Sequence, residues 1–277
     1  MKLTLGYSPC PNDTFIFGAL ATGKVKTSDI EWEILLADVE TLNEWAIAGK
    51  LDVSKISYHA YLHAQHHYLL SQSGSALGRG CGPLVITTPE QLDQLQPEDA
   101  SFAIPGKYTT AYLLSRLRYP RMHHIHQMVF SDIEGAVVRG DTQLGVIIHE
   151  NRFTYQDRGL VSIQDLGAYW EERTGLPIPL GGIAIQRTLP VGRQRQIQEA
   201  IRESLGYAYR HPEEIMPYVS EYAQEMDESV MQKHIDLYVN DFSNDLGTEG
   251  KEAVVALLNH AREVGITDHI IDPLFVP

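Results

Sequence analysis

A histidine and a carboxylate stand together where a short apolar segment of the sequence ends. Residues 145–148 read Gly-Val-Ile-Ile, and His149, Glu150 and Asn151 follow directly. Histidine changes its charge near neutral pH, so a ring nitrogen can take a proton from a substrate. A lone histidine is more often structural, and Glu150 or a backbone carbonyl could satisfy it. Its place at a strand end favours catalysis, and we predict that His149 is a general base that Glu150 or Asn151 orients.

Two further places in the sequence could hold the anionic part of a substrate. Thr109 and Thr110 stand at the start of an expected helix, where free N–H groups and hydroxyls suit a carboxylate or phosphate. Ordinary N-capping explains these threonines equally well. Lys55 and Ser57 flank Ile56 at the end of an apolar segment and share one side of it, because strand side chains alternate. Lys55 could bind an anion or simply point to water.

Other clusters in the sequence do not complete a known motif. The histidines between residues 59 and 67 have helical spacing, but this stretch has no Cys, Asp or Glu to complete a metal site. Residues 149–153, His-Glu-Asn-Arg-Phe, lack the second histidine of the zinc-protease motif. The glycines between residues 74 and 82 precede no Gly-Lys-Ser/Thr, and they form no dinucleotide-binding motif after a strand. We therefore predict neither a metal site nor a nucleotide site.

The composition is that of an ordinary globular protein with an acidic surface. The chain has 277 residues, of which 43% are hydrophobic and 21% charged, and its formal net charge is −14. This charge argues against nucleic acid or a membrane as partner, but a local basic pocket could still bind a small anionic substrate. The sequence begins without an apolar stretch of signal-peptide length, and no apolar run approaches a membrane span. Since Cys10 and Cys81 need not pair, we expect a reduced, cytoplasmic protein of undetermined oligomeric state.

Short apolar segments alternate with amphipathic ones over most of the chain. This alternation predicts an α/β protein with largely parallel sheets. The expected strands are residues 2–8, 30–37, 51–57, 101–104, 126–130 and 144–150. The expected helices are 14–24, 41–50, 58–70, 89–95, 109–117 and 131–140, followed from about residue 190 by 191–210, 212–224, 228–239 and 248–265. Capping boxes, Thr41 with Glu44 and Ser131 with Glu134, are expected to open two of them.

Two segments rich in Gly and Pro, residues 78–87 and 175–185, read as crossings between two lobes. We expect a discontinuous first lobe, residues 1–86 with 183–277, and an inserted second lobe, residues 87–182. In open α/β sheets, ligands sit beyond the carboxyl ends of the strands. The polar segments SPCPND, SKISY, PGKYTT and HENRF follow four expected strands of the two lobes. We therefore expect them to face one cleft.

Five segments of the sequence match the motifs of a known enzyme family. They are SPCPNDTF (8–15), VSKISY (53–58), GCGPLV (80–85), TTA (109–111) and IIHENRFTY (147–155). Together they resemble the 1,4-dihydroxy-6-naphthoate synthases of the futalosine route of menaquinone biosynthesis. The resemblance runs from the first strand to about residue 190. It implies a periplasmic-binding-protein type II fold, with two α/β lobes around a central cleft.

The resemblance also implies an activity and its residues. The family's reaction is a carbon–carbon lyase step that converts cyclic dehypoxanthinyl futalosine to 1,4-dihydroxy-6-naphthoate and a small sugar-derived fragment, expected to be dihydroxyacetone. No metal or organic cofactor is implied. By matching motifs, His149 takes the place of the proton acceptor. The positions that match the family's substrate-binding residues are Lys55, Ile56, Ser57, Thr109 and Thr110.

Two other functions share this fold class and stay open. One is a chorismate dehydratase of the same pathway, against which the segments PCPNDTF and HENRF favour the synthase. The other is a non-enzymatic solute-binding protein that delivers a ligand to a transporter. Because fold alone does not decide function, the absence of an export signal is the feature that favours an enzyme here.

Overall fold

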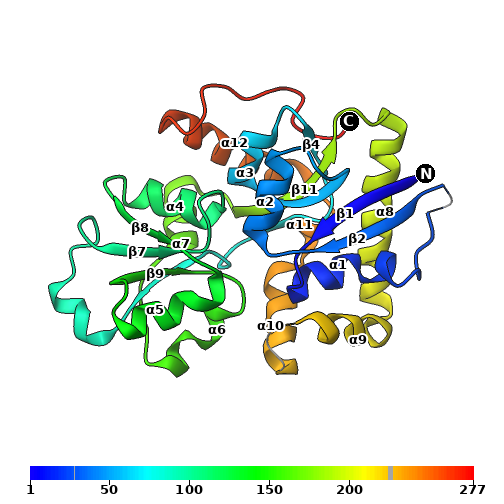
Figure 1. Ribbon diagram of the computed structural model, residues 1–277. Helices are drawn as coiled ribbons and strands as arrows, with labels where there is room; N and C mark the ends of the chain where they lie inside the picture. Colours follow the sequence, from blue (N-terminus) through cyan, green and yellow to red (C-terminus); the bar gives the residue numbers. More distant parts are fainter. Residues whose placement is uncertain (28, 224–226) are drawn as a thin grey trace. The chain divides into compact units, whose positions relative to one another are not determined.

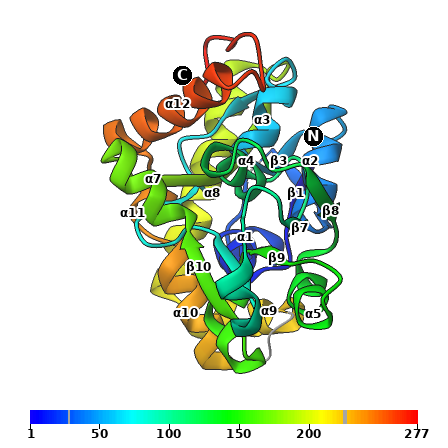
Figure 2. The same ribbon diagram turned by 90° about the vertical axis from the view of Figure 1, so that its left-hand side faces the viewer.

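The computed structural model describes residues 1–27, 29–223 and 227–277. Within them the chain divides into two units (Figures 1 and 2). Unit 1 comprises Met1–Gly78 with Pro179–Pro277, and unit 2 comprises Arg79–Ile178. The divisions come eight and four residues before the expected lobe boundaries. Among the described residues, no helix is both long enough and apolar enough to cross a membrane.

The sheet of unit 1 is built around three parallel strands from the N-terminal part of the chain. Its strands are β1 (Lys2–Tyr7), β2 (Glu31–Leu36), β3 (Val53–Ser57), β4 (Tyr68–Leu70), β5 (Ala76–Gly78) and β11 (Ile178–Gln186). β1 pairs in parallel with β2 and β3, as expected when helices connect consecutive strands. The strand order is β2-β1-β3-β11-β4, with β5 paired to β11.

The structure corrects the prediction for the Gly- and Pro-rich segment 175–185. Most of it is β11, which runs antiparallel to β3 and β4, so the sheet is mixed. The glycines serve close packing between strands: a Cβ at Gly181 would lie 2.8 Å from the carbonyl oxygen of Ile56, and one at Gly182 would lie 2.9 Å from the hydroxyl of Tyr58. Because glycine has no side chain, the strand can approach its neighbours this closely.

Helices cover both faces of this sheet, and α1 packs against α8, α9 and α10 (Figure 1). The helices of unit 1 are α1 (Pro11–Ala21), α2 (Val39–Ile47), α3 (Tyr58–Ala64), α8 (Val191–Arg210), α9 (Pro212–Tyr222), α10 (Glu228–Tyr238), α11 (Asp241–Asn244) and α12 (Gly247–Glu263). The predicted helical tail is confirmed, although Gln224 of the expected helix 212–224 lies outside the described residues. The expected helix 58–70 is wrong beyond Ala64, because residues 68–70 pair with β11 instead.

Both predicted capping boxes are also wrong. α2 begins two residues earlier than expected, at Val39, because the Asp38 carboxylate accepts hydrogen bonds from the N–H groups of Glu40 and Thr41 and so caps the helix. α5 (Ile133–Arg139) begins without a side-chain cap. The Glu134 carboxylate, expected to complete that cap, instead lies 3.0 Å from the guanidinium of Arg158.

The sheet of unit 2 is mixed as well. Its strands are β6 (Leu84–Thr87), β7 (Ser101–Ile104), β8 (His124–Gln127), β9 (Leu144–Ile147) and β10 (Val161–Asp165), in the order β10-β6-β9-β7-β8. β7 is parallel to β8 and β9, whereas β6 is antiparallel to β9 and β10. The expected strand 126–130 is observed earlier in the chain, as β8, and Phe130 lies in a short 3-10 turn instead. The expected helix 89–95 is a 3-10 helix, Pro89–Gln94.

The central strand of this sheet, β9, is fixed by the helix that covers it. α5 packs on β9 (Figure 2), and a Cβ at Gly145 would lie 2.7 Å from Ile133 and 2.9 Å from Val137. The other helices of unit 2 are α4 (Thr110–Arg118), α6 (Asn151–Thr154) and α7 (Leu166–Thr174). β9 is buried along its whole length, so it is a rigid base for the residues that follow it.

Candidate active site

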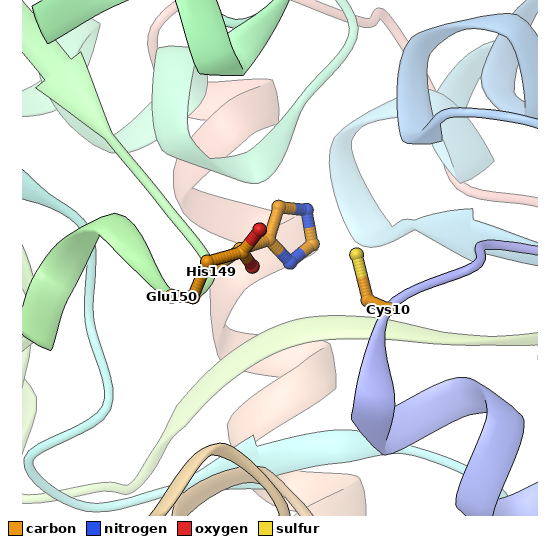
Figure 3. A group of neighbouring side chains, drawn as sticks. All are labelled: Cys10, His149 and Glu150. Atoms are coloured by element: carbon orange, nitrogen blue, oxygen red, sulfur yellow. The ribbon is translucent and has the colours of Figure 1, made fainter. Parts of the chain in front are cut away.

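His149 leaves the end of β9 in a backbone conformation that side chains rarely adopt. Its φ is 57°, and it is the only non-glycine residue with positive φ in the part of the chain that the structure describes. The half-buried imidazole packs against the ring of Phe130, with 4.9 Å between ring centroids and an interplanar angle of 60°. Figure 3 shows the ribbon of β9 running into His149 and Glu150. Strained residues of this kind concentrate at functional sites.

The two residues after His149 have different surroundings. A carboxylate oxygen of Glu150 and a ring nitrogen of His149 lie within 4.8 Å of each other. The side chain of Asn151 hydrogen-bonds Glu134. Burial raises the pKa of the Glu134 carboxyl, and the neighbouring cation of Arg158 opposes that rise. Of the two residues that could orient the imidazole, Glu150 is therefore the better placed.

Arg152 anchors the same turn to the rest of unit 2. Its guanidinium donates to the backbone carbonyl of Gly82 and lies 2.7 Å from a carboxylate oxygen of Asp165. Asp165 in turn caps α7 by accepting hydrogen bonds from the N–H groups of Gly167 and Ala168. The turn that carries the histidine is thus held by a charged pair and a backbone carbonyl.

Thr109 and Thr110 lie where the sequence predicts, at the start of α4. Thr109 is the N-cap: its hydroxyl accepts from the N–H of Tyr112 and donates to the carbonyl of Gly106 at 2.8 Å. Both threonines are buried. The capping interpretation is therefore confirmed for Thr109. The first turn of a helix carries a partial positive charge, which suits an anion.

In unit 1, Lys55 does not point to water. Its ammonium is buried, lies 2.8 Å from a carboxylate oxygen of Asp13 and donates to the carbonyl of Gly74 at 3.2 Å. A Cβ at Gly181 of β11 would lie 3.7 Å from the Cε of Lys55. At that distance a Cβ would make only an ordinary van der Waals contact with the lysine, so it is the carbonyl of Ile56, at 2.8 Å, that requires glycine there.

The buried side-chain amide of Asn43 makes two hydrogen bonds with Ser57. Asn43 Oδ1 accepts from the backbone N–H of Ser57 at 2.9 Å, and Asn43 Nδ2 lies 3.1 Å from the Ser57 hydroxyl. Because the hydroxyl accepts this bond, its own O–H stays available to donate to a ligand. Ile56 points to the opposite face of β3 and is 1% exposed, so a contact with a ligand would have to use its backbone.

Cys81 and the histidines His59 and His63 have surroundings that suggest a structural role. Cys10 and Cys81 are buried and form no disulfide bond, and burial raises the pKa of the Cys81 thiol to about 12. His59 and His63 lie on one helical face with 5.6 Å between ring centroids. In the described ranges, no group of three potential metal ligands contains either of them.

Sequence reasoning missed several side chains that hold the predicted ones. Asp13 belongs to the segment SPCPND, which the rule of strand ends selects, but its pairing with Lys55 has no local signal. Asn43 lies in the middle of α2, where nothing in the sequence distinguishes it from a surface residue. Arg152 stands inside the HENRF segment and was not assigned a role.

The fold places the chain among proteins of the periplasmic-binding-protein class. A protein of Candida albicans described as having the generic periplasmic binding protein fold superposes with a TM-score of 0.70 at 14% identity, over 98% of this chain and 92% of that one. A crystal structure of a protein from Archaeoglobus fulgidus gives a TM-score of 0.90 at 34% identity, over 96% of this chain and 98% of that one. The expected fold class is confirmed.

Sequence comparison defines the family within that class. The model of the menaquinone biosynthesis family matches residues 3–263, and the chain belongs to this family. The 1,4-dihydroxy-6-naphthoate synthase of Thermus thermophilus is 47% identical over 99% of both chains. That of Streptomyces coelicolor is 43% identical over 95% of this chain and 94% of its own. The resemblance stated from the five motifs is confirmed.

Proposed function

We propose that the protein is a 1,4-dihydroxy-6-naphthoate synthase. It acts as a carbon–carbon lyase of the futalosine pathway, converting cyclic dehypoxanthinyl futalosine to 1,4-dihydroxy-6-naphthoate and dihydroxyacetone in the cytoplasm. The observation that carries the proposal is the full-length similarity to a synthase of that name from Thermus thermophilus. The geometry at His149, Lys55 and Thr110 supports a way in which this chain performs the reaction.

His149 is the general base of the proposed reaction. It removes a proton next to a carbonyl or from a hydroxyl, so that a carbon–carbon bond breaks in retro-aldol fashion. Aromatisation of the second ring then provides the driving force, which is why a single base suffices. A well-placed general base contributes typically 10²–10⁴-fold. The fixed backbone at φ 57° and the ring contact with Phe130 support this role, since both limit the orientations of the imidazole.

The remaining residues bind and polarise the substrate. Lys55 and the Ser57 hydroxyl supply donors for its oxygens, and the start of α4 with Thr109 and Thr110 holds its aromatic carboxylate. A charge-assisted hydrogen bond is roughly twice as strong as a neutral one, so Lys55 makes the largest single contribution among these donors. We expect no metal or organic cofactor, and a small anion as the only partner, with neither nucleic acid nor a membrane required.

The test is a direct assay of the purified protein with two substrates. Cyclic dehypoxanthinyl futalosine should yield 1,4-dihydroxy-6-naphthoate, identified by mass and absorbance, and chorismate should be left unchanged. Dehydration of chorismate would assign the sister reaction of the pathway. Binding of the cyclic compound without turnover would instead make the protein a solute-binding protein.

A further inference from the structure

A buried chain of two hydrogen bonds and one ion pair in unit 1 connects α10 to the ammonium of Lys55. His234 of α10 places its Nε2 3.0 Å from Asn12 Oδ1 in the first turn of α1. Asn12 Nδ2 donates to Asp13 Oδ1 at 2.9 Å. The same carboxylate oxygen lies 2.8 Å from Lys55 Nζ. The exposed fractions of Asn12, Asp13 and His234 are 5%, 2% and 1%, so the chain is shielded from solvent.

The Asp13 carboxylate uses all its acceptor capacity inside this chain. Its Oδ1 receives the Asn12 amide and the Lys55 ammonium. Its Oδ2 receives the backbone N–H of Ser8 at 3.2 Å and the Ser8 hydroxyl at 2.7 Å. A carboxylate has about four lone-pair sites. With four donors in place, Asp13 holds the lysine and has no remaining site with which to take a proton from a substrate.

Because the acceptor sites of Asp13 are occupied, the orientations of the Asn12 amide and the His234 imidazole are determined as well. Because Asp13 only accepts, Asn12 must turn its NH₂ group toward the carboxylate and its Oδ1 toward α10. The His234 Nε2 that faces this Oδ1 must then carry a proton and donate it. His234 therefore locks the amide in the one orientation that gives Asp13 its donor.

At the other end of the chain, Lys55 has one N–H left. An ammonium has three donors: one donates to the carbonyl of Gly74, and the ion pair with the Asp13 carboxylate engages a second. The structure gives the third no acceptor among the described residues. Since the hydrogen bond to Gly74 and the ion pair with Asp13 together hold the ammonium, the direction of the remaining N–H depends on the position of Asp13.

We propose that Asn12 and His234 are positioning residues for Lys55. Acting through the carboxylate between them, they hold its third N–H in the direction in which it meets an anionic oxygen of the substrate. The identity of that substrate rests on the proposed function, whereas the orientation of the ammonium does not. Helix α10, far from Lys55 in the sequence, thereby affects the reaction without touching the reacting atoms.

The variants His234→Leu and His234→Gln separate the hydrogen bond from the packing. Leucine fills similar volume without a donor, and glutamine carries an N–H donor near the place of the imidazole Nε2. His260→Leu is the matched control, because His260 of α12 is a half-buried histidine whose Nδ1 lies 2.9 Å from the carbonyl of Ala256 in its own helix. Circular dichroism and urea unfolding establish that each variant is folded. If His234→Leu does not fold, Asn12→Leu replaces it in every measurement.

The first measurement needs no substrate. Competitive acetylation with acetic anhydride, followed by mass spectrometry, compares the labelling rate of Lys55 between variants. An ammonium held by a carboxylate is shielded from the reagent, so labelling should rise several-fold in His234→Leu. It should stay at the wild-type rate in His234→Gln and His260→Leu. An unchanged rate in folded His234→Leu, or an equal rise in His234→Gln, overturns the proposal.

The second measurement is a double-mutant cycle on kcat/KM with the cyclic substrate. His234→Leu should lower kcat/KM roughly tenfold, within the range for coupled neighbours, and should have little effect once Lys55 is already methionine. An equal loss in both backgrounds would identify a purely structural role and overturn the proposal. A wild-type protein that leaves the substrate unconverted refutes the proposed function instead, and the labelling result then decides the inference alone.

Discussion

Replacing His149 by glycine should give a more stable protein than replacing it by alanine, which is the reverse of the usual order. In ordinary backbone conformations glycine costs about 0.5–1 kcal/mol relative to alanine. At the φ of 57° observed here, an L residue pays roughly 1–2 kcal/mol that glycine does not. Both variants lose the imidazole and its contact with Phe130, so those losses cancel in the comparison. The glycine variant should therefore exceed the alanine variant by on the order of 0.5–1 kcal/mol.

Urea unfolding of the two variants measures this difference. Val138 provides the matched control, because it lies on α5 of the same unit and is 52% exposed. There, glycine should be less stable than alanine by about 0.8–1 kcal/mol, the ordinary helical penalty. If alanine at position 149 is as stable as glycine while the control behaves normally, the left-handed backbone at the end of β9 is not a feature of the folded protein in solution.

Four further results are expected. Burial raises the pKa of Glu134, so the folded state binds its proton more firmly than the unfolded state does. The free energy of unfolding should therefore fall as the pH rises from the usual carboxyl range through the raised pKa. Urea unfolding of Glu134→Gln across this pH range should lack that fall. Because burial raises the pKa of Cys81 to about 12, its alkylation in the native protein at mildly alkaline pH should be far slower than in the unfolded chain, and equal rates would contradict its burial. Thr110→Val should weaken product binding by about 1–3 kcal/mol in a calorimetric titration, and unchanged affinity would remove Thr110 from the site. Turnover should survive exhaustive chelation, with metal content measured on the same sample; a loss that zinc restores would contradict a metal-free reaction.

The parts of the fold that the sequence predicts correctly are those with a local periodic signal. β1, β7 and β9 begin at their predicted residues because each is a short, mostly apolar run that is followed by polar residues. The prediction failed where tertiary contacts override local pattern. The segment 58–70 has a continuous helical pattern, yet residues 68–70 pair with β11. Gly181 and Gly182 suggested a loop, although a neighbouring carbonyl and a tyrosine hydroxyl require glycine there.

The candidate site also has features that the sequence predicts and features that depend on tertiary contacts. The strand-end rule selects the segments that contain Asp13, Lys55, Thr110 and His149 because it depends only on where strands stop. It does not reveal the pairing of Lys55 with Asp13, since the two belong to different elements and no short motif spans them. Nor does it reveal the left-handed backbone of His149, because a histidine in the sequence has no mark of its φ angle.

The measurement that tests the account most directly is the turnover and product binding of His149→Asn, made on one preparation. Asparagine keeps a similar size and some hydrogen bonding but does not accept the proton. If His149 is the general base, turnover of cyclic dehypoxanthinyl futalosine should fall by on the order of 10²-fold or more, while calorimetric binding of 1,4-dihydroxy-6-naphthoate changes little. A folded variant with near wild-type turnover would remove His149 from the chemical step, and binding lost in parallel with turnover would make it a ligand contact instead.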